Sequence, residues 1–130
     1  MKKTLIITNF FPPAIGGIEK YFEQVCSRLP AEKVVILTAK NAAAAESDKG
    51  KLYKIIRTDF FSGKYPPRWK PLKKIIKKII KEEGIEAIIF GHFHPYALLG
   101  RSFGLPYYIF GHGTDIRQIK TSWWQKRAFK

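Results

Sequence analysis

The sequence is poor in cysteine and in acidic residues, and it has no long apolar run. Cys26 is the one cysteine among 130 residues, so the chain cannot form an internal disulfide framework. This usage is typical of the cytoplasm, where we expect the protein to reside. No apolar run approaches the roughly 18 residues of a membrane-spanning helix. The apolar stretch after Lys2 and Lys3 is also too short for the core of a signal peptide.

Basic residues greatly outnumber acidic ones. The chain has 24 lysines and arginines against 10 aspartates and glutamates, a formal net charge of +14. Such an excess favours an anionic partner: a phosphate-bearing substrate, an anionic lipid surface or nucleic acid. Charge alone does not choose among the three. The hydrophobic content of 45%, with 15% aromatic residues, is typical of a packed domain and not of a disordered chain.

Short apolar, β-branched runs alternate with amphipathic segments along the chain. We expect strands over residues 4–8, 33–38, 52–57, 87–90 and 106–110. Helices are expected after Gly17, over 71–83, from Pro95 to Gly104 and over 122–130, with a mobile loop at 41–51 and a long loop at 59–70. This alternation predicts one α/β domain over 1–130, Rossmann-like, with a mainly parallel, doubly wound sheet flanked by helices.

The segment 71–83 has a strong helical pattern. Its apolar residues recur at helical spacing: Leu72, Ile75, Ile76, Ile79 and Ile80. Lysines fill the opposite face: Lys73, Lys74, Lys77, Lys78 and Lys81. One interpretation is a solvated face on a helix that packs on the core. The other is an interfacial helix on anionic lipid, which would make the protein peripheral to the inner face of a membrane.

Residues 9–21 read Asn-Phe-Phe-Pro-Pro-Ala-Ile-Gly-Gly-Ile-Glu-Lys-Tyr and connect the first strand to the first helix. Pro12 and Pro13 stiffen this loop, while Gly16 and Gly17 let the backbone approach a ligand closely. A helix that begins at paired glycines offers unpaired N–H groups to a phosphate. The loop is neither a Walker loop, because no Lys-Ser/Thr follows the glycines, nor a dinucleotide-binding Gly-x-Gly-x-x-Gly motif.

A strand, then Phe-Phe-Pro-Pro-x-x-Gly-Gly-Ile-Glu, then an amphipathic helix resembles the start of glycosyltransferase family 4 enzymes. The resemblance implies a GT-B fold of two Rossmann-like domains and transfer of a sugar from a nucleotide-sugar donor with retention of configuration. It also implies no metal or other cofactor, and an acceptor that is a glycan, a lipid or a small molecule. The resemblance covers nearly all of the chain but only the N-terminal, acceptor-side domain. The Glu-x7-Glu motif of the donor-binding domain is absent, so we expect a truncated domain that is inactive alone.

Three glycine-containing loops follow the first, fourth and fifth expected strands, over residues 9–17, 91–94 and 111–115. In a parallel sheet these loops meet at one edge, where ligands bind. By resemblance, His112 is the catalytic residue, in hydrogen-bond contact with the donor sugar or its leaving phosphate. Asp115 would orient His112, bind an acceptor hydroxyl or cap the following turn.

The other candidate residues lie in the same three loops. By resemblance, the residues that contact the donor or the acceptor are Gly16, Gly17, Glu19, His92, His94, Gly113 and Asp115. Glu19 would bind acceptor hydroxyls or serve only the helix dipole. His92 and His94 face the same side of an extended backbone, but zinc needs three or four ligands. We therefore favour acceptor or sugar contacts, with plain loop roles as the alternative, over a metal site.

The composition is also compatible with two other functional classes. A nucleic-acid-binding module would draw on the charge of +14 and on the stacking surfaces of Trp69, Trp123 and Trp124, although no known nucleic-acid motif is present. A flavodoxin-like signalling or scaffold domain would need an acidic cluster in the first loop, where this chain has Asn9, Pro12 and Pro13. We therefore expect a glycosyltransferase domain and no nucleic-acid partner.

Overall fold

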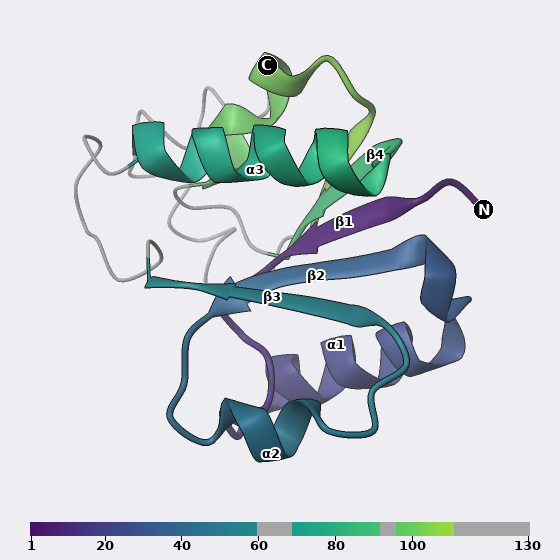
Figure 1. Cartoon of the computed structure of the whole chain (residues 1–130), viewed down its shortest axis with the longest axis vertical. Helices are drawn as coiled ribbons and strands as arrows, with labels where there is room; N and C mark the ends of the chain where they lie inside the picture. Colours follow the sequence, from purple (N-terminus) through teal and green to yellow (C-terminus); the bar gives the residue numbers. More distant parts are fainter. Residues whose placement is uncertain (60–68, 92–95, 111–130) are drawn as a thin grey trace.

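A five-stranded parallel sheet in the order β3-β2-β1-β4-β5 forms the centre of the molecule (Figure 1). The computed structural model describes residues 1–59, 69–91 and 96–110. The strands are β1 (Thr4–Ile7), β2 (Val34–Ala39), β3 (Lys54–Thr58), β4 (Ala87–Phe90) and β5 (Tyr107–Ile109). The expected Rossmann-like α/β fold is therefore confirmed.

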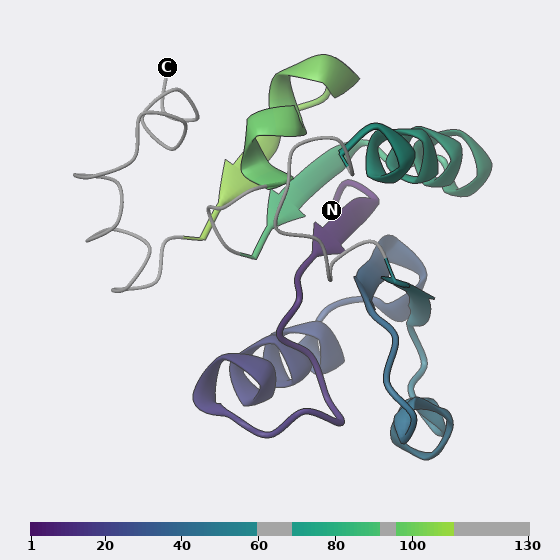
Figure 2. The same ribbon diagram turned by 90° about the vertical axis from the view of Figure 1, so that its left-hand side faces the viewer.

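Helices cover both faces of this sheet, as the two views in Figures 1 and 2 show. On one side lie α1 (Gly17–Arg28) and α2 (Ala44–Asp48), and on the other lie α3 (Trp69–Glu83) and the 3-10 helix η4 (Tyr96–Phe103). A further 3-10 turn, η1 (Ala31–Lys33), precedes β2. The sheet is thus doubly wound.

Successive side chains of the central strands point to opposite faces and build two separate cores. Leu5 and Ile7 of β1 belong to the cluster under α3, whereas Ile6 packs with Phe22 and Cys26 of α1. All four residues of β1 are buried, as expected for a parallel strand with helices on both faces. Burial also raises the pKa of the Cys26 thiol to about 12, which suits an unreactive core residue.

The expected helix over 71–83 is present, and it begins two residues earlier, at Trp69. Leu72 and Ile76 are completely buried against the sheet, and Ile79 is 5% exposed. Pro71 is consequently the third residue of α3. A proline is tolerated in the first turn because an N–H there would have no partner within the helix.

The expectation of a mobile loop over 41–51 is wrong, because this segment contains α2. The side-chain oxygen of Asn41 accepts a hydrogen bond from the Ala43 N–H (2.9 Å), and the Asn41 carbonyl accepts one from the Ala44 N–H (3.0 Å). Asparagine starts turns in this way, and the alanines that follow have the highest helix propensity. The expected helix over 122–130 and most of the loop over 59–70 lie outside the described residues.

The carboxyl ends of β1, β4 and β5 lie side by side at one edge of the sheet. Gly91 donates a backbone hydrogen bond to the Ile7 carbonyl (2.7 Å), and Phe110 donates one to the Phe90 carbonyl (2.8 Å). Gly91 leaves no space for a side chain. A Cβ atom there would lie 2.7 Å from Cβ of Thr8 and 2.9 Å from Cζ of Phe22, both in the core.

We predict that Gly91→Ala destabilises the fold by about 1–3 kcal/mol, because the added methyl overpacks a buried contact. Gly17→Ala is the control, since no heavy atom of a described residue lies within 4 Å of its Cβ position. Chemical denaturation of both variants measures the free energy of unfolding. Equal stability of Gly91→Ala and the wild type would contradict the packing described here.

Candidate functional site

The loop between β1 and α1 is held in the core at its start and projects into solvent at its end. Thr8 Oγ1 accepts a hydrogen bond from the Phe10 N–H (3.0 Å), and Phe11 is 2% exposed, with its ring edge-on to Tyr53. From Ala14 onward the loop is exposed, and the side chain of Ile15 lies entirely in solvent. The anchored start thus presents residues 14–17 at the edge where the strands end.

Two hollows lie on either side of the first turn of α1. One, of about 280 Å³, is lined by Pro12, Pro13, Ala14, Ile15, Gly16, Lys20 and Glu23. The other, of about 260 Å³, is lined by Gly17, Ile18, Tyr21 and Phe110. We call the first the loop hollow and the second the aromatic hollow. A larger hollow of about 350 Å³ lies at the other end of α1, beside Ser27 and Leu29, and is not part of this site.

An aromatic cluster joins α1 to the end of β5. The ring centre of Phe110 lies 6.0 Å from that of Tyr21 and 5.9 Å from that of Phe22. Such tilted and edge-to-face pairs are favourable arrangements of aromatic rings. The cluster therefore brings the start of the loop after β5 next to the paired glycines, as the sequence predicted for this edge.

The two glycines have different surroundings. Gly16 is the N-cap of α1, and its carbonyl accepts the first helical hydrogen bond from the Lys20 N–H (3.2 Å). The Glu19 carboxylate folds back over Gly16, so that a Cβ atom added to Gly16 would overlap it. At Gly17 the corresponding space is free of described atoms. The carboxylate of Glu19, in the first turn of α1, interacts favourably with the positive end of the helix dipole.

Of the candidates from the sequence, the structure brings Gly16, Gly17 and Glu19 together at this edge. The remaining candidates, His92, His94, His112, Gly113 and Asp115, lie outside the described residues. Within the described ranges, no group of three or more histidine, cysteine, aspartate or glutamate side chains is placed to hold a metal ion. Asn9, at the start of the loop, has a buried side-chain oxygen that accepts no hydrogen bond from any residue that the structure describes.

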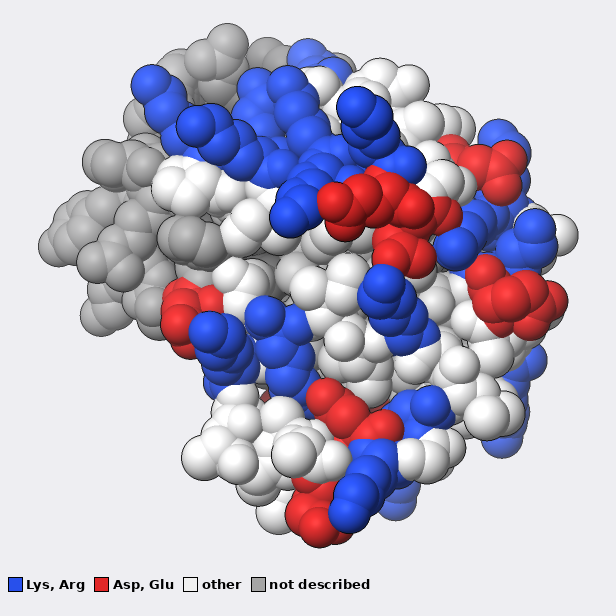
Figure 3. Space-filling view, in the orientation of Figure 1, with Lys and Arg blue, Asp and Glu red and all other residues white. Residues whose placement is uncertain are grey.

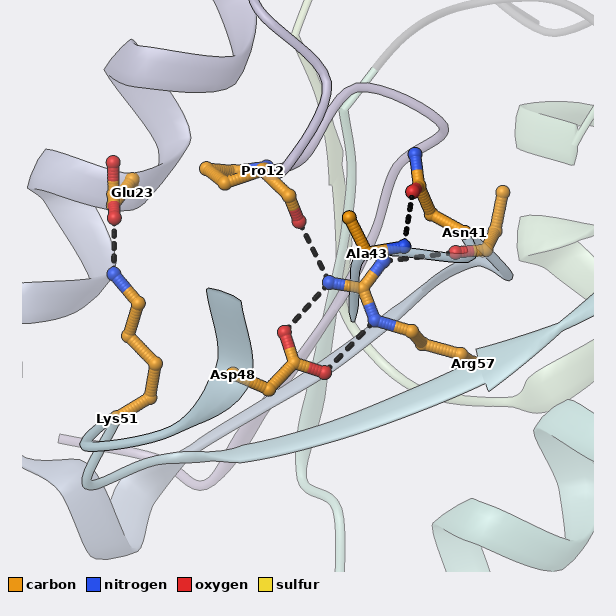
Figure 4. A network of polar contacts seen from close by, with 8 residues as sticks. Pro12, Glu23, Asn41, Ala43, Asp48, Lys51 and Arg57 are labelled. Carbon is orange, nitrogen blue, oxygen red and sulfur yellow. Dashed lines mark hydrogen bonds and ion pairs between the residues drawn. The ribbon is translucent and has the colours of Figure 1, made fainter. Parts of the chain in front are cut away.

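Sequence reasoning missed the contact between Arg57 and this loop. Arg57 ends the expected third strand, and its guanidinium donates a hydrogen bond to the Pro12 carbonyl (2.6 Å) and binds Asp48 (Figure 4). A signal was present, because an arginine in a largely apolar strand needs a partner for its charge. The sequence pattern does not say which partner that is.

No family model matches the chain. It is 34% identical over 105 residues to the GDP-mannose-dependent monoacylated alpha-(1-6)-phosphatidylinositol monomannoside mannosyltransferase of Corynebacterium glutamicum. That match covers 75% of this chain and 26% of the relative, so the chain spans about a quarter of the relative's length.

Among solved structures, L-threonine 3-dehydrogenase from Trypanosoma brucei is similar in fold. The TM-score is 0.51 with 15% sequence identity, over 84% of this chain and 36% of the dehydrogenase. At this identity the likeness concerns the fold alone, and it agrees with the Rossmann-like sheet. The sequence similarity to a mannosyltransferase, in contrast, supports a relationship of this chain to glycosyltransferases.

Proposed function

We propose that this chain forms the acceptor-side domain of a retaining family 4 glycosyltransferase with a GT-B fold. It would help transfer a sugar from a nucleotide-sugar donor to a glycan, lipid or small-molecule acceptor. The observation that carries this proposal is the 34% identity to a GDP-mannose-dependent mannosyltransferase through three quarters of the chain. A second, donor-binding domain would complete the site, and residues 1–130 alone would not turn over.

Within this site, Glu19 is proposed to bind an acceptor hydroxyl. Its carboxylate already lies over Gly16, at the positive end of α1. A phosphate could reach Gly16 only after the Glu19 side chain turns away, because the negative charges of a phosphate and of the Glu19 carboxylate repel each other at close range. A hydroxyl group can instead donate a hydrogen bond to the carboxylate where it stands. The geometry therefore favours the acceptor over the donor diphosphate at Gly16.

His112 is proposed to contact the transferred sugar or the leaving phosphate, with Gly113 and Asp115 beside it. His92 and His94 are proposed to contact the acceptor or the sugar. Support comes from the described residues just before them, since Gly91 and Phe110 lie at the same edge as the paired glycines. An imidazole can donate a hydrogen bond to a sugar oxygen when neutral and stabilise phosphate charge when protonated.

The test of this function uses the chain together with its native donor-binding domain. GDP-mannose, other nucleotide sugars and a phosphatidylinositol monomannoside serve as probes, and nucleotide release is measured. We expect release that depends on one donor, and a fall on the order of 10²-fold in kcat in His112→Ala because a group acting at the reacting sugar is lost. Arg101→Ala, an exposed change on η4, is the control.

Absence of nucleotide release with every donor would overturn the proposal. Salt-sensitive binding of arbitrary DNA in the same preparation would then favour the nucleic-acid module, because neutralisation of phosphates makes affinity fall with salt.

The assignment of Glu19 has its own test. We predict that Glu19→Gln raises the KM for the acceptor about tenfold or more and leaves the KM for the donor unchanged, because a charged hydrogen bond to a hydroxyl is weakened. Glu32→Gln, at an exposed position shortly after α1, removes the same negative charge and is the control. A lower KM for the donor in Glu19→Gln would instead assign Gly16 to the donor phosphate.

We also propose an anionic membrane surface as a partner, and α3 is the element that would contact it. The exposed side of this helix presents Lys74, Lys77, Lys78 and Lys81, with the partly exposed Lys73 beside them (Figure 3). Lys78 pairs only loosely with Glu82, at 3.9 Å in solvent. The isoleucines of α3 lie in the core or pack against it, so contact with lipid would be mainly through charge. Among the described helices, none combines the length and the apolar character needed to cross a membrane.

We predict that the triple variant Lys74→Gln, Lys77→Gln, Lys78→Gln loses affinity for phosphatidylserine-containing vesicles on the order of 10²-fold. Each lysine near such a surface contributes about 1 kcal/mol. The matched control removes the same charge elsewhere, by changing Lys33, Lys40 and Lys49 to glutamine. Sedimentation with vesicles measures the affinity. If both triple variants lost the same affinity for the vesicles, binding would depend on net charge alone. That result would contradict a binding role for the lysine face of α3.

A further inference from the structure

Arg57 connects four separate parts of the chain through one guanidinium group (Figure 4). Its Nε and Nη2 atoms donate hydrogen bonds to the two carboxylate oxygens of Asp48, at 2.9 and 2.7 Å. Nη1 donates to the Ala39 carbonyl (2.9 Å), and Nη2 also donates to the Pro12 carbonyl (2.6 Å). The end of β3 is thereby tied to α2, to the end of β2 and to the loop between β1 and α1.

This contact differs from the well-exposed ion pairs on the surface. The Arg57 side chain is 11% exposed and that of Asp48 is 28% exposed, whereas the Lys40–Asp59 pair is 62% and 74% exposed. Exposed pairs contribute little because water screens them, but a bidentate pair that is mostly buried fixes its geometry. Asp48 therefore holds the guanidinium plane in the orientation that reaches Pro12.

The loop hollow depends on this contact. Pro12 and Pro13 form its loop wall, and Glu23 of α1 forms part of its helical wall. Lys51, just after α2, forms an ion pair with Glu23 (Figure 4). Both walls of the loop hollow are consequently fastened to the stretch of chain after α2: one to Lys51, which precedes β3, and the other to Arg57 in β3.

We propose that Arg57 is a positioning residue for the site at the paired glycines. Through the Pro12 carbonyl it holds residues 12–16 in the arrangement that places Gly16 and Glu19 toward the acceptor, and Asp48 in turn orients Arg57. The functional part of this inference rests on the proposed function. Arg57 itself touches the loop backbone and would contact no reacting atom. Lysine cannot replace it, because an ammonium group lacks the planar fork that reaches the carboxylate and both carbonyls at once.

The variants Arg57→Lys and Asp48→Asn test the inference in the protein that includes the donor-binding domain. Arg57→Lys keeps the positive charge but removes the planar guanidinium group. Asp48→Asn keeps Arg57 but removes the carboxylate that binds it through two hydrogen bonds. Ile79→Val is the control, since Ile79 is buried on the opposite face of the sheet and its truncation lowers stability without a contact to the loop.

Two measurements are made on all three variants. The first is the position of the amide NMR resonances of Ala14, Ile15, Gly16 and Gly17. The second is the steady-state kinetics with GDP-mannose and a phosphatidylinositol monomannoside as probes. We expect shifted loop resonances in Arg57→Lys and Asp48→Asn, with an acceptor KM raised about tenfold and a kcat within about twofold of the wild type.

The Ile79→Val control should lower the melting temperature while its loop resonances and acceptor KM stay as in the wild type. Unchanged loop resonances in both Arg57→Lys and Asp48→Asn would overturn the positioning role. An acceptor KM that rises equally in Ile79→Val would also overturn it, because the effect would then follow from stability alone. If the wild type turns over neither probe, the proposed function fails at that point, and the loop resonances alone decide on Arg57.

Discussion

The central place of β1 is the constraint on which the rest of the structure depends. Its residues pair in parallel with β2 on one side and with β4 on the other, from Thr4 to Ile7. A strand in this position has no exposed face, so α1 must cover one side and α3 the other. The same pairing brings the ends of β1 and β4 together, and β5 follows beside β4. The candidate site therefore lies where the strand order reverses, as in other open α/β sheets.

Apolar and polar contacts have different structural roles around the β1–α1 loop. The apolar ones, Gly91 against Phe22 and Phe110 against Tyr21, hold α1 on the sheet and close the site on the side of β5. Packing of this kind does not tolerate an added methyl group. On the side of β3 the loop is held by a polar contact, from Arg57 to the Pro12 carbonyl. A hydrogen bond of this kind specifies the direction of the backbone, whereas apolar packing specifies mainly the distance between elements.

The large positive charge is spread over the surface without weakening the core. On α3 the lysines lie outside and the isoleucines inside, so the helix is stabilised by burial of its apolar face. Its last turn is also fastened to the sheet, where Glu83 binds Lys54 and lies 3.7 Å from Lys3. The Lys54 ammonium lowers the pKa of the Glu83 carboxyl. Acidic groups are scarce in this chain, and this one joins the end of α3 to β3 and to Lys3, the residue just before β1.

The sequence by itself determined the strands of this protein and the helix over 71–83, although not α2, and it determined the edge at which the first, fourth and fifth strands end. Buried strands and the amphipathic helix over 71–83 were predictable because local periodicity reports which side of an element is apolar. Only the tertiary structure decided the partner of Arg57 and the place of the Glu19 carboxylate. Pairing of β2 with β3 sets Arg57 opposite Thr38, within reach of a carbonyl 45 positions earlier in the chain. Such a contact depends on strand register and on the path of a loop, and no local pattern in the sequence carries that information.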